Sequence, residues 1–257
     1  MSLSYFCAVS DSLVIIPTYN EIENIEAMIR RVFTLPKAFH VLIIDDGSPD
    51  GTAQRVLELQ LEYPDSLYLL QRPGKLGLGT AYIMGFRWAL DRRYNYIFEM
   101  DADFSHNPMD LLRLYDACAG EGHDMAIGSR YVKGVNVVNW PMSRVLMSYF
   151  ASLYVRFITG LPIHDSTAGF KCYTRRVLET IDLANIKFVG YAFQIEMKFT
   201  TWKWGFSIKE VPIIFTDRDK GVSKMSRHIF KEAIFGIIYM KLKSFFKSYQ
   251  PRELVNE

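Results

Sequence analysis

Two aspartates, Asp101 and Asp103, stand one residue apart directly after a largely apolar stretch. In an extended segment, residues two positions apart project to the same side, so both carboxylates can share one hard divalent cation. Mg²⁺ typically takes one or two protein carboxylates and completes its shell with phosphate and water oxygens. The pair therefore indicates a metal–diphosphate site. A pair of exposed loop acids is the alternative interpretation.

Acidic and glycine-rich segments follow other apolar stretches. Asp46, in the segment DDGSPDGT (45–52), could accept hydrogen bonds from a ribose or a base. The same segment also has the composition of a turn that leads into a helix, and PTYNE (17–21) has the same two interpretations. The loop GKLGLGT (74–80) lacks the spacing of a P-loop or a dinucleotide-binding loop. We interpret it as a tight turn in which Lys75 is available to an anion.

Several basic side chains could bind phosphate. Arg130 follows an apolar stretch, and Arg144 and Ser148 stand one turn apart on an expected helix. Arg218 and Lys224 lie together in the segment DRDKGVSK. The guanidinium fork suits phosphate oxygens. Each of these residues alone is more typical of a solvated surface, so a binding role depends on their meeting the aspartates.

The elements that must position these residues alternate along the first half of the chain. Strands are expected at 13–17, 40–45, 67–71, 96–100 and 124–129, and helices at 22–33, 52–63, 78–92 and 108–119. This alternation predicts an α/β fold with a mostly parallel sheet covered on both faces. Ligands bind beyond the carboxyl ends of the strands in such sheets, where the polar segments lie. Further on, the pattern predicts a helix at 143–159, a strand at 208–215 and an amphipathic helix at 228–246.

Composition limits the class of protein. The chain has 257 residues, of which 49% are hydrophobic and 23% charged, which excludes a disordered chain. Its net charge of +2 argues against a surface that binds polyanions generally, and no nucleic-acid-binding module is present. Residues 218–252 carry nine basic and two acidic side chains. They indicate either an anionic partner or a solvated basic helix.

Compartment and membrane signals are weak. The three cysteines have no metal-binding or disulfide spacing, which favours a reduced, cytoplasmic compartment. The N-terminal residues lack the pattern of a signal peptide. The uncharged runs are well short of the ~20 apolar residues that cross a bilayer.

Six motifs occur in a specific order: PTYNE, DDGSPDGT, GKLGLGTAY, MDADFSHNP, GSRY and DRDKGVSK. With them the chain closely resembles the dolichol- or polyprenol-phosphate mannose synthases, which are inverting family-2 glycosyltransferases with a GT-A (Rossmann-like) fold. The resemblance covers roughly residues 11–245. It implies a catalytic domain at 1–225, followed by a C-terminal amphipathic basic helix and tail at 226–257 that belongs to the same domain.

The resemblance also implies roles for particular residues. The guanosine of the donor would lie among Pro17, Tyr19, Glu21, Ile44 and Asp46. The donor diphosphate and its Mg²⁺ or Mn²⁺ would be held by Asp101, Ala102 and Asp103, with Ser105 where some relatives carry Gln. Arg130, Arg144 and Ser148 would receive the acceptor phosphate, and Asp165 would support that site. Arg218 and Lys224 would close over the donor phosphates.

The implied reaction is transfer of mannose from GDP-mannose to dolichyl or polyprenyl phosphate. The acceptor monoester is already largely ionised at pH 7, because its second pKa is ~6, so it needs no strong base. Asp101, Asp103 and Arg130 are the expected catalytic residues. A UDP-glucose-dependent polyprenyl-phosphate glucosyltransferase or another family-2 enzyme is the alternative, as is an inactive subunit that binds lipid or a partner.

A lipid acceptor requires contact with a membrane. We expect peripheral association with the cytosolic face, through residues 145–158, the helix 229–246 and the basic tail. Packed core helices are the alternative, as is docking onto a small membrane-anchoring subunit.

Overall fold

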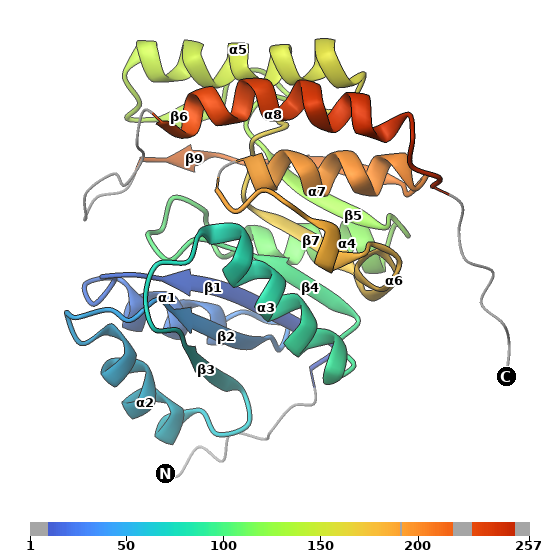
Figure 1. Cartoon of the computed structure of the whole chain (residues 1–257). Helices are drawn as coiled ribbons and strands as arrows, with labels where there is room; N and C mark the ends of the chain where they lie inside the picture. Colours follow the sequence, from blue (N-terminus) through green and yellow to red (C-terminus); the bar gives the residue numbers. More distant parts are fainter. Residues whose placement is uncertain (1–9, 191, 218–227, 250–257) are drawn as a thin grey trace, which may run out of the picture.

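The computed structural model describes residues 10–190, 192–217 and 228–249. The chain forms a seven-stranded sheet in the order β3-β2-β1-β4-β7-β5-β8, and β6 and β9 form a separate two-stranded ladder (Figure 1). The strands are β1 (Ser12–Thr18), β2 (His40–Asp45), β3 (Leu67–Gln71), β4 (Tyr96–Glu99), β5 (Met125–Ser129), β6 (Val137–Val138), β7 (Lys171–Thr174), β8 (Ile208–Pro212) and β9 (Phe215–Thr216). The helices are α1 (Ile25–Phe33), α2 (Thr52–Glu62), α3 (Leu78–Asp91), α4 (Asp110–Ala119), α5 (Met142–Thr159), α6 (Arg175–Thr180), the 3₁₀ turn η1 (Leu183–Asn185), α7 (Ala192–Lys203) and α8 (His228–Ser244).

Helices cover both faces of the sheet, as the alternation predicts. Along β1, Leu13 and Ile15 belong to one core with α3 and α7, while Val14 and Ile16 belong to the other with α1, α2 and α4. Successive side chains of a strand point to opposite faces. A strand buried on both faces therefore reads as a continuous apolar run, as β1 does.

The parallel register brings the carboxyl ends of the central strands to one edge. Pro17 of β1 pairs with Ile44 of β2, and Ile15 pairs with Glu99 of β4. The polar segments after β1, β2 and β4 therefore begin at nearly the same level. The five strands expected in the first half are all present.

The second half departs from the expectations in two ways. Strand β7 runs antiparallel between β4 and β5, and neither β7 nor α7 was predicted. The expected strand at 208–215 is divided: β8 pairs with β5, and β9 pairs with β6. Residues 192–201 of α7 are all buried, so the helix lacks the one-sided apolar pattern that reveals an amphipathic helix.

Helix α8 packs against both α5 and α7, and α5 forms the outermost layer, at the top of Figure 1. Large apolar side chains of both helices face outward, including Phe150 and Phe157 on α5 and Tyr239 and Leu242 on α8. In the part of the chain that the structure describes, no helix is long and apolar enough to cross a bilayer.

Candidate active site

A cavity of about 530 Å³ lies where the segments after β4 and β5 meet α5 and the loop before β7. Six residues that the sequence singles out line it: Asp101, Asp103, Ser105, Arg130, Arg144 and Ser148. Part of the remaining wall is apolar and comes from α5 and α7, with Met147, Ala151, Tyr154, Val155 and Ile195. The cavity thus joins an acidic pair, two guanidinium groups and an apolar surface.

The acidic pair is held by a tight turn. Phe104 adopts a left-handed backbone conformation with φ of 59°. The turn lets both the amide and the hydroxyl of Ser105 donate to Oδ1 of Asp103, at 3.1 and 2.6 Å. Asp103 is buried, whereas the Asp101 side chain is 42% exposed. Ser105 therefore orients one of the two carboxylates.

The donor set here fits a hard cation. Asp101, Asp103 and Ser105 present only oxygen atoms, which Mg²⁺ and Mn²⁺ prefer. Within the described residues no three His, Cys, Asp or Glu side chains gather as a closed metal site. A cation bound by this pair would therefore complete its shell with diphosphate and water oxygens, as Mg²⁺ commonly does.

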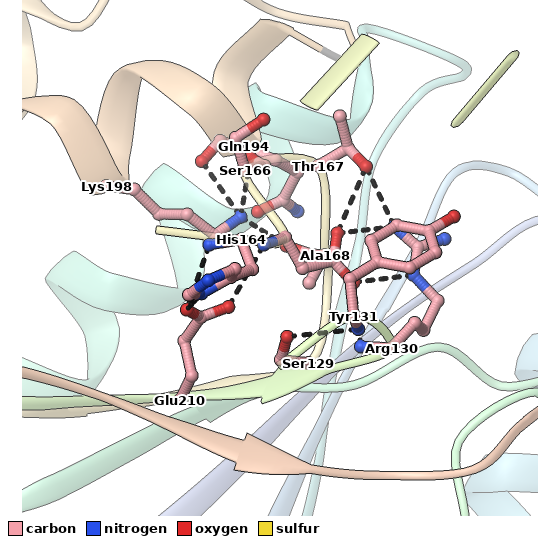
Figure 2. A network of polar contacts seen from close by, with 11 residues as sticks. Ser129, Arg130, Tyr131, His164, Ser166, Thr167, Ala168, Gln194, Lys198 and Glu210 are labelled. Carbon is pink, nitrogen blue, oxygen red and sulfur yellow. Dashed lines mark hydrogen bonds and ion pairs between the residues drawn. The ribbon is translucent and has the colours of Figure 1, made fainter. Parts of the chain in front are cut away.

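Arg130 is buried and held in a fixed plane (Figure 2). Its Nε and Nη2 donate to the two carboxylate oxygens of Asp165 at 2.7 and 2.6 Å, and Nη2 also donates to Oγ1 of Thr167 at 2.8 Å. Burial favours a raised pKa for Asp165, but the charge and hydrogen bonds of Arg130 outweigh it and hold the pKa below its ordinary value. The pair therefore stays charged at neutral pH.

Arg144 lies across the cavity on α5. Its guanidinium stacks over the ring of Trp140, with 4.1 Å to the ring centroid, and donates to Asp217 at 2.8 Å. The hydroxyl of Ser148 and the indole N–H of Trp140 are buried and have no hydrogen-bond partner among the described residues. Buried donors without partners are costly, so both fit a ligand that supplies acceptor oxygens.

His106 also lines the cavity and is neutral at pH 7. It stacks on Phe170, with 4.9 Å between the centroids. Burial, together with the charges of Arg130 and Lys171, lowers the pKa of His106 to about 4. Among the described residues that line the cavity, the positive charge therefore comes from the two arginines.

The residues expected around the donor base gather at the ends of β1 and β2. Asp46 forms a 2.6 Å ion pair with the buried Arg72, and burial raises the pKa of Asp46 despite that partner. Lys75 lies 3.7 Å from the ring centroid of Tyr19, which brings the glycine-rich loop to the end of β1. Pro17 and Glu21 are half-buried beside them.

One residue expected at the donor base lies in the core instead, and two residues expected at the donor phosphates cannot be placed. Ile44 is fully buried and contacts the helix α3 at Gly85, so its side chain lies in the core rather than at the surface. Arg218 and Lys224 lie outside the described residues. Ala102 is buried between the two aspartates.

Arg72 and Trp140 were not predicted from the sequence as residues of the site. Arg72 directly follows β3 and also donates to Thr80 at 2.7 Å, which links Asp46 to the glycine-rich loop. Trp140 lies two residues before the start of α5, and Arg130 lies 5.4 Å from its ring centroid. A single arginine after a strand and a tryptophan in a loop carry no pattern that separates them from ordinary surface and core residues.

The model of glycosyl transferase family 2 matches residues 13–182. The polyprenol monophosphomannose synthase of Mycolicibacterium smegmatis is 50% identical over 226 residues, which cover 88% of this chain and 85% of the relative. The undecaprenyl-phosphate mannosyltransferase of Micrococcus luteus is 46% identical over 225 residues, covering 88% and 91%.

Solved structures show the same fold. Glucosyl-3-phosphoglycerate synthase from Mycobacterium tuberculosis, in complex with Mn²⁺, UDP and glucosyl-3-phosphoglycerate, matches with a TM-score of 0.64 at 16% identity, over 90% of this chain and 78% of the other. A mannosyltransferase from Pyrobaculum calidifontis, in complex with GDP-Man and Mn²⁺, matches with a TM-score of 0.58 at 16% identity, over 94% of this chain and 66% of the other.

The mostly parallel sheet and these structural neighbours define a GT-A fold. Within that class, the chain belongs to glycosyl transferase family 2. The expected α/β fold and enzyme class are thereby confirmed. The roles of the individual site residues stay predictions.

Proposed function

We propose that this glycosyltransferase transfers mannose from GDP-mannose to a dolichyl or polyprenyl phosphate and produces the β-linked lipid phosphate sugar. The observation that carries the proposal is the single cavity in which Asp101 and Asp103 face two arginines beside an apolar wall. Such a lining suits a diphosphate, a phosphate monoester and the first part of a lipid chain. The names of the two relatives at 46 and 50% identity support the same acceptor and sugar.

The protein's own residues bind and orient the two substrates. Arg130, Arg144, Ser148 and Trp140 provide donors for the acceptor phosphate, which is ionised without help from a base. Asp101 and Asp103 would hold a Mg²⁺ or Mn²⁺ ion, which stabilises the charge that develops on the departing diphosphate. Positioning the phosphate in line with the anomeric carbon is the main remaining task. One displacement inverts that carbon.

The donor is testable without turnover. A ligand that binds the folded state raises the unfolding temperature according to its affinity. With Mn²⁺ present, we expect GDP and GDP-mannose to raise the melting temperature at concentrations where UDP and UDP-glucose have little effect. Stabilisation by the uridine nucleotides alone would reject GDP-mannose and favour the glucosyltransferase alternative.

Trp140 provides a second test, directed at the acceptor. Replacing it by phenylalanine keeps a ring beside Arg144 but removes the indole N–H. Because a hydrogen bond to a charged group is worth about 1.5–3 kcal/mol, we expect kcat/KM for polyprenyl phosphate to fall at least about tenfold, with an unchanged KM for the nucleotide sugar. Equal loss for both substrates would contradict a specific acceptor contact.

We also propose that α5 and α8 contact the surface of a membrane, at its cytosolic face. Phe157 on α5 and Phe246 just after α8 are 85% and 91% exposed, and Lys243 and Lys247 are close to Phe246 in sequence. Apolar side chains beside lysines suit the interface of an anionic bilayer.

Flotation with anionic liposomes tests this contact. The double substitution Phe157→Glu and Phe246→Glu is expected to reduce the bound fraction strongly, because each buried phenylalanine contributes about 1.5–3 kcal/mol. Leu61→Glu is the matched control, since Leu61 is 86% exposed on the distant helix α2. Loss of flotation in the control alone, or in neither variant, contradicts the proposal. Failure of the wild type to float favours a membrane-anchoring subunit as the partner.

A further inference from the structure

The side chains of Glu210, which is 9% exposed, and of the fully buried Lys198 hold the loop at 164–168 from opposite sides (Figure 2). Glu210 of β8 accepts hydrogen bonds from the backbone N–H groups of His164 and Asp165, at 2.9 and 3.0 Å. Lys198 of α7 donates to the carbonyl oxygens of Ser166 and Ala168, at 2.9 and 2.6 Å. An anion thus holds the donors of this loop and a cation holds its acceptors.

Lys198 is notable because its ammonium group is fully buried. Its third acceptor is also a backbone carbonyl, that of Gln194 at 3.3 Å. Three carbonyl acceptors match the three protons of an ammonium group. Burial lowers the pKa of Lys198 well below its ordinary value, and the three carbonyl oxygens hold its amino group at the loop.

The loop in turn holds Arg130. Asp165 accepts from the backbone amide and from Nε and Nη2 of Arg130, and Thr167 accepts from Nη2. Arg130, Thr167 and Ala168 line the cavity, whereas Lys198 and Glu210 do not. Contacts therefore run from α7 and β8 through the loop to a guanidinium group in the cavity.

We propose that Lys198 and Glu210 are positioning residues for the acceptor phosphate, which they act on only through the loop at 164–168 and Arg130. The inference rests on the proposed function for the identity of that ligand. The donor-side residues Asp46 and Lys75 lie on other segments, at the ends of β2 and β3. Loosening the loop therefore weakens acceptor binding and leaves donor binding intact.

Lys198→Met tests the inference, because it keeps much of the side-chain volume and removes all three donors. We expect the KM for a short-chain polyprenyl phosphate to rise about tenfold, the scale of a lost charged hydrogen bond, with the KM for GDP-mannose unchanged. Lys203→Met is the matched control on the same helix, and its kinetic constants stay at the wild-type values. Equal changes in both KM values, or a change in kcat alone, overturn the inference.

Glu210→Gln keeps the size of the side chain and is the second variant, should Lys198→Met fail to fold. The two backbone N–H groups donate to different carboxylate oxygens of Glu210, and an amide has only one oxygen, so the same rise in acceptor KM is expected. In an Arg130→Lys background, either substitution is expected to add little further effect, because residues that act through one another are not additive. Fully additive effects would show that Lys198 and Glu210 act independently of Arg130, which contradicts the inference.

Hydrogen exchange separates failure of this inference from failure of the proposed function. Without any substrate, Lys198→Met is expected to speed exchange at the amides of Arg130 and Asp165, which donate to Asp165 and Glu210. Unchanged exchange at these two amides would overturn the inference that Lys198 holds the loop. Faster exchange would support the inference even if the wild type transfers no sugar from any donor to polyprenyl phosphate. That lack of transfer would reject the proposed function alone.

Discussion

Replacing Asp103 by alanine is expected to lower the rate of sugar transfer by about 10³-fold, the scale found when charge stabilisation of a transition state is removed. The carboxylate is buried and oriented by the amide and hydroxyl of Ser105. Among the described residues that line the cavity, Asp101 and Asp103 are the only carboxylates, so no other group can replace Asp103. The measurement is single-turnover transfer with saturating donor, acceptor and Mn²⁺.

Asp91→Ala is the control for this variant, since Asp91 is exposed at the end of α3. Both variants are expected to unfold at the wild-type temperature, so that loss of activity in Asp103→Ala reports chemistry rather than folding. Turnover retained by Asp103→Ala would contradict the assignment of the acidic pair. Equal losses in the two variants would contradict it too.

Arg144→Ala is expected to lower kcat/KM for polyprenyl phosphate by about 100-fold, because a guanidinium–phosphate contact contributes about 1.5–3 kcal/mol. Arg144 is partly exposed and stacks on Trp140, so the fold tolerates its removal. The KM for the nucleotide sugar is expected to stay unchanged. Steady-state kinetics with each substrate varied in turn measures the difference.

Two further variants test the role of Arg144 more specifically. Arg144→Lys keeps the charge without the fork and is expected to recover only part of the loss. Arg156→Ala, further along the same helix α5, is expected to behave as the wild type. A rise in the KM for the nucleotide sugar in Arg144→Ala would place Arg144 at the donor instead.

The strands and helices of the first half were predictable because their apolar residues recur with clear periods. The polar ends of β1, β2, β4 and β5 could be expected at one edge, because parallel strands end together. The structure brings the segments after β4 and β5 into one cavity with Arg144 and Ser148. It also gathers the acids and Lys75 near β1 and β2.

What escaped prediction depends on contacts between distant residues. Strand β7 carries Lys171, a residue untypical of a buried strand, and its ammonium group is stabilised by Glu99 at 2.9 Å across the sheet. Helix α7 is buried on every side, so its period is hidden. The link between Arg144 and Asp217 spans 73 positions. No local sequence pattern predicts such pairs. The same holds for Lys198 and the carbonyl groups that it binds.

The central claim is the reaction itself, and one transfer assay tests it most directly. The purified protein, Mn²⁺ and a short-chain polyprenyl phosphate are incubated in parallel with GDP-mannose and with UDP-glucose, and lipid-linked sugar is measured. We expect lipid-linked mannose from GDP-mannose and no product from UDP-glucose. Transfer from UDP-glucose alone would contradict the proposed reaction.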